Sequence, residues 1–179
     1  FYKMRDEHEG LLHYFSKKFE KIIVITSSRV NKKQFPKKIN FLNINSIFWF
    51  NRNRLIKSII CFFLGLSLYS QKEKIILSFQ SNIFSIILSK IINSKIIIRL
   101  NTSPEKYISS PFKKIIFKNF YNFSDEIIVN SFEFKKKLKK ILKLDSQVIY
   151  NPIALPRKIK KKKIYYFNNY KHLKILNIG

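Results

Sequence analysis

The stretch that decides the fold is "SDEIIVNSFEFKKKLKK" at residues 124–140, which "DSQVIYNPI" at residues 145–153 closely follows. Residues 125–130 form a short, β-branched apolar run, and unbroken hydrophobicity of this length is typical of a strand buried on both faces of a parallel sheet. Residues 147–150 repeat the pattern before the chain meets Asn-Pro. The segment between the two runs therefore predicts the helix of a strand–helix–strand step.

That helix also explains the lysines that crowd this segment. Ser131 is a suitable N-cap, and Glu133 falls in the first turn, where the helix dipole favours an acid. A core-facing stripe then recurs at helical spacing, formed by Phe134, Leu138, Ile141 and Leu142. The opposite, solvent-facing side takes Lys135, Lys136, Lys137, Lys139 and Lys140. We therefore interpret the lysines as the solvent-exposed face of an amphipathic helix rather than as a ligand-binding site.

The same alternation of short apolar runs and helical segments extends along the chain. Strands are predicted at residues 21–26, 73–79, 94–100, 125–130 and 147–150, with 39–44 as a weaker sixth. Helices are predicted at residues 10–19, 81–92, 109–123 and in the segment after Ser131. Strands that alternate with helices predict the α/β class, with a Rossmann-like, doubly wound parallel sheet.

Three helical segments carry more specific expectations. Ser81 is the expected N-cap of the helix at 81–92, which should be mostly buried with a narrow polar stripe of Asn82, Ser85 and Ser89. Ser110 and Pro111 predict the next helix start, and its apolar face is expected to be Phe112, Ile115, Ile116 and Phe120. The apolar run at 59–69 is too short to cross a bilayer and is expected to form a buried helix.

The charge of the chain is extreme. Lysine and arginine number 36 against 10 aspartates and glutamates, which gives a formal net charge of +26. Such a charge is typical of proteins that bind nucleic acid, acidic membranes or phosphorylated ligands. A second reading is compositional drift toward AT-rich codons, because Lys, Ile, Asn and Phe are abundant while Gly is only 3. The drift reading would place lysine at any exposed position that tolerates it.

Several site types are excluded by the residue inventory. The single cysteine, Cys61, cannot form an internal disulfide, and no Cys/His spacing resembles a zinc site, so no metal is expected. The N-terminal residues lack the apolar core of a signal peptide. We expect a cytoplasmic, reducing environment and a cysteine that serves only packing.

Domain boundaries follow from changes in pattern. Residues 1–152 are predicted to form one Rossmann-like domain that ends at Asn151-Pro152. Residues 153–172 are rich in lysine without a clear period and predict a basic interdomain linker. Residues 173–179 ("LKILNIG") predict the first strand of a second domain that is truncated here, and the chain is expected to be a fragment.

In a doubly wound sheet, ligands gather at the carboxyl ends of the strands, beside the helix N-termini. Those positions here are Ser78–Ser81, Arg99–Ser103 and Asn130–Ser131. The binding site is expected at this edge.

The order of these segments resembles the N-terminal domain of GT-B glycosyltransferases of the family 4 type. The matching elements are "FEKIIVITSS", "IILSFQSNIFSIILSKIINSKIIIRLNTSPEKY", "SDEIIVNSFEFKKKLKK", "VIYNPI" and "KILNIG". The individual motifs are loose, whereas their order and spacing over nearly the whole chain are fairly specific. The usual first strand with its Gly-rich loop is expected either to be missing or to lie before Phe1, because the pattern is entered at the first helix.

The resemblance implies a retaining hexosyltransferase that moves a sugar from a nucleoside-diphosphate sugar to a glycan or lipid-linked acceptor. It further implies no obligatory metal or other cofactor, a role in lipopolysaccharide or other surface polysaccharide synthesis, and a place at the inner face of the plasma membrane. The N-terminal domain would hold the acceptor, while the catalytic and donor-binding groups, with a Glu-x7-Glu motif, would belong to the second domain. The fragment alone should then be inactive.

Residues of this chain that would contact the acceptor are Arg99, Asn101, Ser103, Ser81, Asn130, Ser131, His8 and Glu9. Many family members have a histidine where this chain reads Arg99-Leu100-Asn101, so hydrogen bonds to acceptor hydroxyls or phosphate are assigned to Arg99 and Asn101. In the alternative reading, Arg99 pairs with a nearby carboxylate, Ser103 and Ser131 only cap helices, and His8 and Glu9 are a polar helix end.

Two other functional classes stay open. A basic nucleic-acid-binding module would need its cations on one face with aromatics or a reading helix among them, whereas the lysines here are spread along the chain. A non-catalytic protein that binds anionic membrane surfaces would use the charge directly. We expect partners to be a nucleotide sugar, an acceptor and an anionic membrane, and no nucleic acid.

Overall fold

The computed structural model describes residues 6–27, 30–43, 53–70, 74–106, 108 and 110–151, so the predicted linker and the predicted strand at 173–179 lie outside the described residues. The helices are α1 (Asp6–Lys18), α3 (Arg54–Leu66), α4 (Asn82–Ile91), α5 (Pro111–Asn122) and α6 (Phe132–Leu142), with short 3-10 turns η1 (Lys32–Gln34) and η2 (Pro104–Lys106). The strands are β1 (Ile22–Ile25), β2 (Ile39–Leu42), β3 (Ile75–Ser78), β4 (Lys95–Leu100), β5 (Glu126–Val129) and β6 (Gln147–Val148). All strands predicted between residues 21 and 150 are present, including the weaker one at 39–44.

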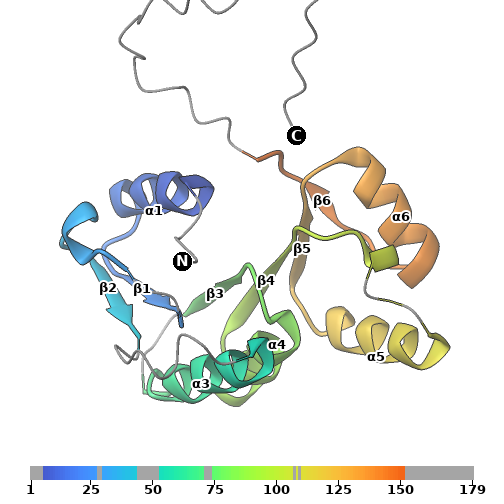
Figure 1. Cartoon of the computed structure of the whole chain (residues 1–179), viewed down its shortest axis with the longest axis horizontal. Helices are drawn as coiled ribbons and strands as arrows, with labels where there is room; N and C mark the ends of the chain where they lie inside the picture. The colour runs from blue at the N-terminus through green and yellow to red at the C-terminus, as the bar shows by residue number, and fades with distance from the viewer. Residues whose placement is uncertain are drawn as a thin grey trace, which may run out of the picture.

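All strand pairs are parallel. One ladder joins β1 to β2, and a second joins β3, β4, β5 and β6 in that order. Figure 1 draws β1 beside β3, so the strands follow the spatial order β2-β1-β3-β4-β5-β6 although no ladder joins β1 to β3 in the described chain. The chain winds outward in both directions from the boundary between β1 and β3, which is the switch point of a doubly wound sheet. The predicted α/β, Rossmann-like fold is confirmed.

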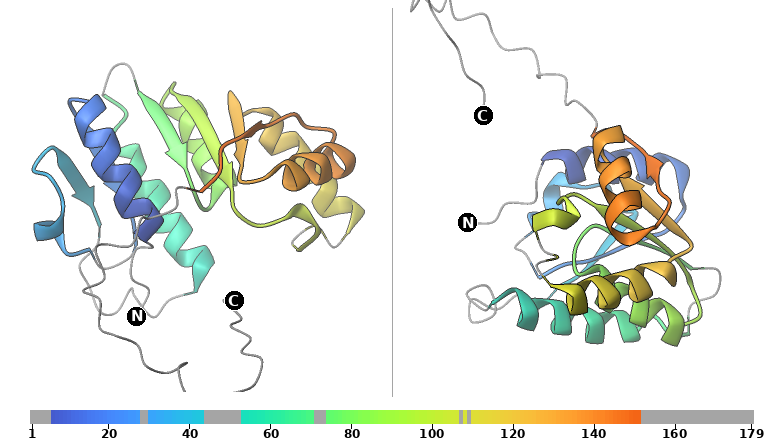
Figure 2. Two further views of the ribbon diagram at one scale, coloured as in Figure 1. Left: turned by 90° about the horizontal axis from the view of Figure 1, so that it is seen from above. Right: turned by 90° about the vertical axis from the view of Figure 1, so that its right-hand side faces the viewer.

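Helices cover the sheet in two layers. Figures 1 and 2 show α1 and α6 on one face and α3, α4 and α5 on the other. The core lies around β4, whose Ile96 and Ile98 are fully buried, and against Val129 of β5. α6 adds Leu138 and Leu142 to this core. Burial of β4 and β5 on both sides is the reason for their continuous apolar sequences.

The cap, the first-turn acid and most of the buried stripe predicted for α6 are confirmed. The Ser131 hydroxyl accepts a hydrogen bond from the Phe134 N–H at 3.2 Å, and Glu133 lies in the first turn. Phe134, Leu138 and Leu142 are buried. The helix ends at Lys143, whose left-handed backbone (φ 60°) forms the C-cap.

The cap assigned to α4 was wrong. Ser81 adopts a left-handed conformation (φ 56°, ψ 37°), and its side chain makes no capping hydrogen bond. The expected polar stripe exists, but it faces inward: Ser89 is fully buried and its hydroxyl donates to the Ile86 carbonyl at 2.7 Å. Tertiary contacts of the serine side chains, described below, explain both features.

The apolar face predicted for α5 is not the buried one. Ser110 caps the helix through a hydrogen bond from Lys113 N–H, as expected, but Phe117 and Tyr121 pack on the core. Phe112 and Ile115 of the predicted face are exposed. Apolar residues occur almost all round this helix, so helical spacing alone could not identify its inner side.

The helix expected in the apolar run at 59–69 is only partly buried. α3 begins at Arg54 and buries Ser58 and Gly65, whereas Phe63 and the following Tyr69 are exposed. Gly65 permits close packing, because a Cβ at this position would overlap Leu88 of α4. In the described part of the chain, no helix combines the length and apolar character that a membrane crossing requires.

Lys74 has a structural role at the amino end of β3. Its ammonium donates to the carbonyls of Leu68, Tyr69 and Ile92 at 3.3, 2.9 and 2.9 Å. These carbonyls follow the last turns of α3 and α4, where the helix dipoles favour a cation. The three donors of the ammonium therefore join the ends of two helices to the start of the strand.

Two lysine-to-glycine substitutions in and after α6 are predicted to have opposite effects. Lys143→Gly should raise the free energy of unfolding by about 1 kcal/mol, because glycine adopts the left-handed C-cap conformation without the Cβ penalty. Lys136→Gly, at an exposed position inside α6, should lower it by about 1 kcal/mol. Urea denaturation of both variants measures the difference, and equal signs would contradict the assigned helix end.

Candidate functional site

The carboxyl ends of the parallel strands meet at one edge of the sheet, and the helices that follow them begin there. Asn53, Ser110 and Ser131 cap α3, α5 and α6 at this edge through their side-chain oxygens. α4 also begins there, at Ser81, without such a cap. Polar side chains and helix N-termini therefore concentrate where the topology of the sheet predicts a ligand site.

A buried serine at the end of β3 organises the centre of this edge. The Ser78 hydroxyl lies 2.8 Å from Asn82 Oδ1 and 2.9 Å from Ser85 Oγ. Asn82 Nδ2 in turn reaches the carbonyl of Arg99 at 3.5 Å. A hydroxyl has one proton to donate and can accept from a second partner, so this network ties β3, α4 and β4 together.

The left-handed turn between β3 and α4 is held from the neighbouring helix. Ser81 Oγ lies 2.5 Å from Ser58 Oγ, and Ser58 also donates to the Arg54 carbonyl at 2.9 Å. This contact takes the Ser81 side chain toward α3 rather than onto the first turn of α4. The physical reason for the failed cap prediction is therefore a contact between residues that lie far apart in the sequence.

Arg99 is the buried cation of the edge, with 6% of its surface exposed. Its guanidinium donates to Asn151 Oδ1 at 2.6 Å and reaches the Ile149 carbonyl at 3.5 Å. These acceptors lie at the end of the described chain, just after β6. Arg99 thus fixes the path by which the chain leaves the sheet. Its predicted contact with an acceptor molecule stays a prediction.

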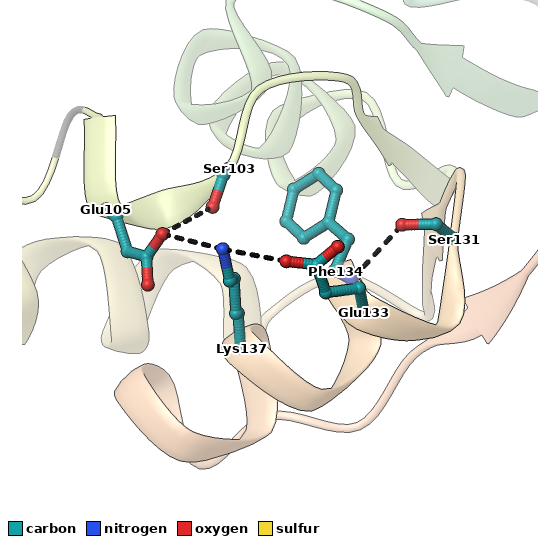
Figure 3. Close-up of polar contacts among 6 residues, drawn as sticks. All are labelled: Ser103, Glu105, Ser131, Glu133, Phe134 and Lys137. Atoms are coloured by element: carbon teal, nitrogen blue, oxygen red, sulfur yellow. Dashed lines mark hydrogen bonds and ion pairs between the residues drawn. The ribbon is translucent and has the colours of Figure 1, made fainter.

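A second polar cluster joins the loop after β4 to α6 (Figure 3). Lys137 Nζ lies 3.1 Å from Glu105 and 3.0 Å from Glu133, and Ser103 Oγ reaches Glu105 at 3.5 Å. The hydrogen bonds that the Lys137 ammonium donates to the carboxylates of Glu133 and Glu105 raise the pKa of Lys137 above its usual value. Lys137 is therefore an exception to the prediction that the α6 lysines only face solvent.

The other predicted site residues divide by their positions. Asn101 is exposed, and Ser103, Asn130 and Ser131 are half-buried at the same edge. His8 and Glu9 lie in the first turns of α1, which runs back to β1 from this side. Sequence reasoning missed Ser58, Asn82, Ser85, Glu105 and Lys137 as members of the edge. Of these, only Asn82 and Ser85 left a signal, as part of a polar stripe on an otherwise apolar helix.

A shallow hollow of about 480 Å³ lies at the opposite edge of the sheet, near the amino ends of β5 and β6. Asp125, Glu126 and Asp145 line it together with Lys135. The Asp125 carboxylate has a structural role, because it accepts a hydrogen bond from the Ile96 N–H at 2.6 Å. We assign the site to the carboxyl edge instead, since the strand ends and helix N-termini converge there.

The chemistry of the carboxyl edge is that of hydrogen bonding. It offers hydroxyl, amide and backbone groups, which suit a polyhydroxylated or phosphorylated ligand. Among the described residues, no group of three or more His, Cys, Asp or Glu side chains could hold a metal ion. Burial raises the pKa of the Cys61 thiol, beside Ser27, which keeps it protonated and poorly nucleophilic at neutral pH.

Comparison with protein-family models and with curated proteins finds no match to the chain. A functional assignment therefore depends on the order of the sequence motifs and on the geometry of the carboxyl edge.

The Ser78 network should contribute measurably to stability. Ser78→Ala leaves Asn82 and Ser85 without their shared partner, so the free energy of unfolding should fall by about 1–3 kcal/mol. Ser70→Ala, at an exposed position, should change it by less than about 0.5 kcal/mol. Urea denaturation followed by circular dichroism compares the two variants; equal effects would mean that the network is not formed.

Proposed function

We propose that this chain is the acceptor-side domain of a retaining glycosyltransferase. It would transfer a hexose from a nucleoside-diphosphate sugar to a glycan or lipid-linked acceptor in surface polysaccharide synthesis. The observation that carries the proposal is the polar carboxyl edge beside the switch point between β1 and β3. The segments "IILSFQSN", "KIIIRLNTSPEK" and "SDEIIVNS", which carry the family resemblance, supply consecutive parts of this edge.

Exposed residues of the carboxyl edge are proposed to contact the acceptor, whereas buried ones hold the edge in place. Asn101 and Ser103 follow β4, and the exposed Asn101 amide is free to meet a ligand hydroxyl or phosphate from solvent. The buried Arg99 side chain fixes the end of the chain after β6 at this edge, because it donates a hydrogen bond to Asn151. The donor and the catalytic groups belong to a second domain, which would face this edge; no metal is required.

The distribution of cations disfavours a nucleic-acid module. Lys113, Lys114 and Lys118 lie on α5, whereas Lys136 and Lys140 lie on α6, on the opposite face of the sheet. A nucleic-acid strand or duplex needs a continuous basic surface. The finer location that we propose is peripheral attachment at the cytoplasmic face of the plasma membrane, where lipid-linked acceptors are found.

Kinetics of the complete gene product test the function. Asn101→Ala and Ser103→Ala should each raise the KM for the acceptor about tenfold, the value of one lost hydrogen bond, with the KM for the nucleotide sugar unchanged. Ser70→Ala serves as the control. Transfer of radiolabelled sugar to membrane extract is measured across a panel of nucleoside-diphosphate sugars.

Two results would overturn the proposal. The first is no sugar transfer from any donor of the panel. The second is a coding sequence beyond Gly179 that lacks a second α/β domain with Glu-x7-Glu within roughly the length of one domain.

A further inference from the structure

The outer side of α5 is apolar where a surface helix is normally polar. Phe112, Ile115 and Phe123 are 71%, 57% and 58% exposed. With Asn119 they recur at i, i+3, i+7 and i+11, so they lie along one stripe, directed away from the core residues Phe117 and Tyr121. Burial in the described fold does not explain this stripe.

The same feature continues across the helix layer. α4 packs against both α3 and α5, and the three helices cover one face of the sheet (Figure 1). Exposed apolar residues of α3 and α4 are Leu55, Phe63 and Ile91. Together with Phe112, Ile115 and Phe123 they define what we call the apolar layer face. Exposed apolar side chains gathered on one helix layer indicate an interaction surface.

The charges of these three helices are all of one sign. No aspartate or glutamate occurs in α3, α4 or α5. Their cations are Arg54, Lys57, Lys90, Lys113, Lys114 and Lys118. The opposite layer differs, because α1 and α6 both contain acids, among them Glu133. The three helices that carry the apolar layer face therefore bear cations and no acids.

We propose that the apolar layer face docks on the surface of an anionic lipid bilayer. Aromatic and aliphatic side chains would enter the headgroup region, while the lysines would extend their ammonium groups to lipid phosphates. This combination is the one expected of a protein that lies on a membrane rather than crosses it.

Other occupants fit the charges less well. A second copy of the chain would bring the same cations face to face, and residues 153–172 of this chain are themselves lysine-rich. Nucleic acid would satisfy the cations, but it gives aliphatic side chains such as Leu55 and Ile115 no favourable environment. An anionic bilayer satisfies both parts of the surface.

The inference deepens the membrane location within the proposed function and specifies the surface that would mediate it. It does not depend on sugar transfer, because vesicle binding is measured without a nucleotide sugar. A chain that binds vesicles but transfers no sugar would refute the proposed enzyme activity and support the docking surface. A protein that transfers sugar but does not bind vesicles would refute the docking surface and support the enzyme activity.

Vesicle sedimentation with the full 179-residue chain tests the apolar part. The chain should pellet with phosphatidylglycerol-containing vesicles and not with phosphatidylcholine vesicles, and high salt should weaken binding steeply. Phe112→Ser with Ile115→Ser should lower the partition coefficient more than about tenfold. The matched control is Tyr14→Ser with Phe132→Ser, which removes exposed aromatics from α1 and α6 and should change it less than about twofold.

A second pair of variants separates a specific face from general positive charge. Lys113→Gln with Lys114→Gln should lower anionic vesicle binding about tenfold or more, whereas Lys136→Gln with Lys140→Gln removes the same charge from α6 and should have little effect. Circular dichroism checks that all variants fold. Equal losses from the two lysine pairs, unchanged binding in the apolar variant, or tighter binding to duplex DNA with the same variant dependence would each overturn the proposal.

Discussion

The hydrogen bond from Arg99 to Asn151 is the interaction on which the carboxyl edge depends. Arg99 belongs to β4, the most deeply buried strand, and Asn151 lies where the chain leaves the sheet after the two-residue strand β6. A strand this short makes few ladder hydrogen bonds, so a buried guanidinium at 2.6 Å is a large part of what fixes its end. The same β4 residue also accepts from Asn82 through its carbonyl, which links the exit of the chain to the Ser78 network.

The position of a lysine says more about its role than the number of lysines. Lys74 joins two helix ends to β3, and Lys137 joins the loop after β4 to α6. Lys136 and Lys140 have the solvated positions that an amphipathic helix requires. Among the helices that the structure describes, only α3, α4 and α5 combine cations with exposed apolar side chains and a lack of acids. The formal charge of +26 is therefore the sum over lysines with different roles: some are structural, some are only solvated, and some are candidates for contact with a membrane.

The sequence pattern predicted correctly those elements that depend on interactions between residues close in the sequence. The continuous apolar runs identified all six strands of the described residues, and the Ser131 cap with its buried stripe identified α6. The failures arose where distant residues decide the outcome: Ser81 turns toward Ser58 across 23 positions, and Arg99 meets an amide 52 residues away. The inner side of α5 was also beyond prediction, because nearly every side of that helix is apolar and only its packing against α4 and α6 selects one.

A double-mutant cycle on Arg99 and Asn151 tests most directly the claim that this pair holds the edge. Arg99→Met, Asn151→Ala and the double variant are compared with the unsubstituted chain by urea denaturation; methionine fills much of the same volume but has no donor for Asn151 Oδ1. We predict a coupling energy of about 1–3 kcal/mol, since a charge-assisted hydrogen bond in a buried site is lost in each single variant. Additive effects within about 0.5 kcal/mol would contradict the account.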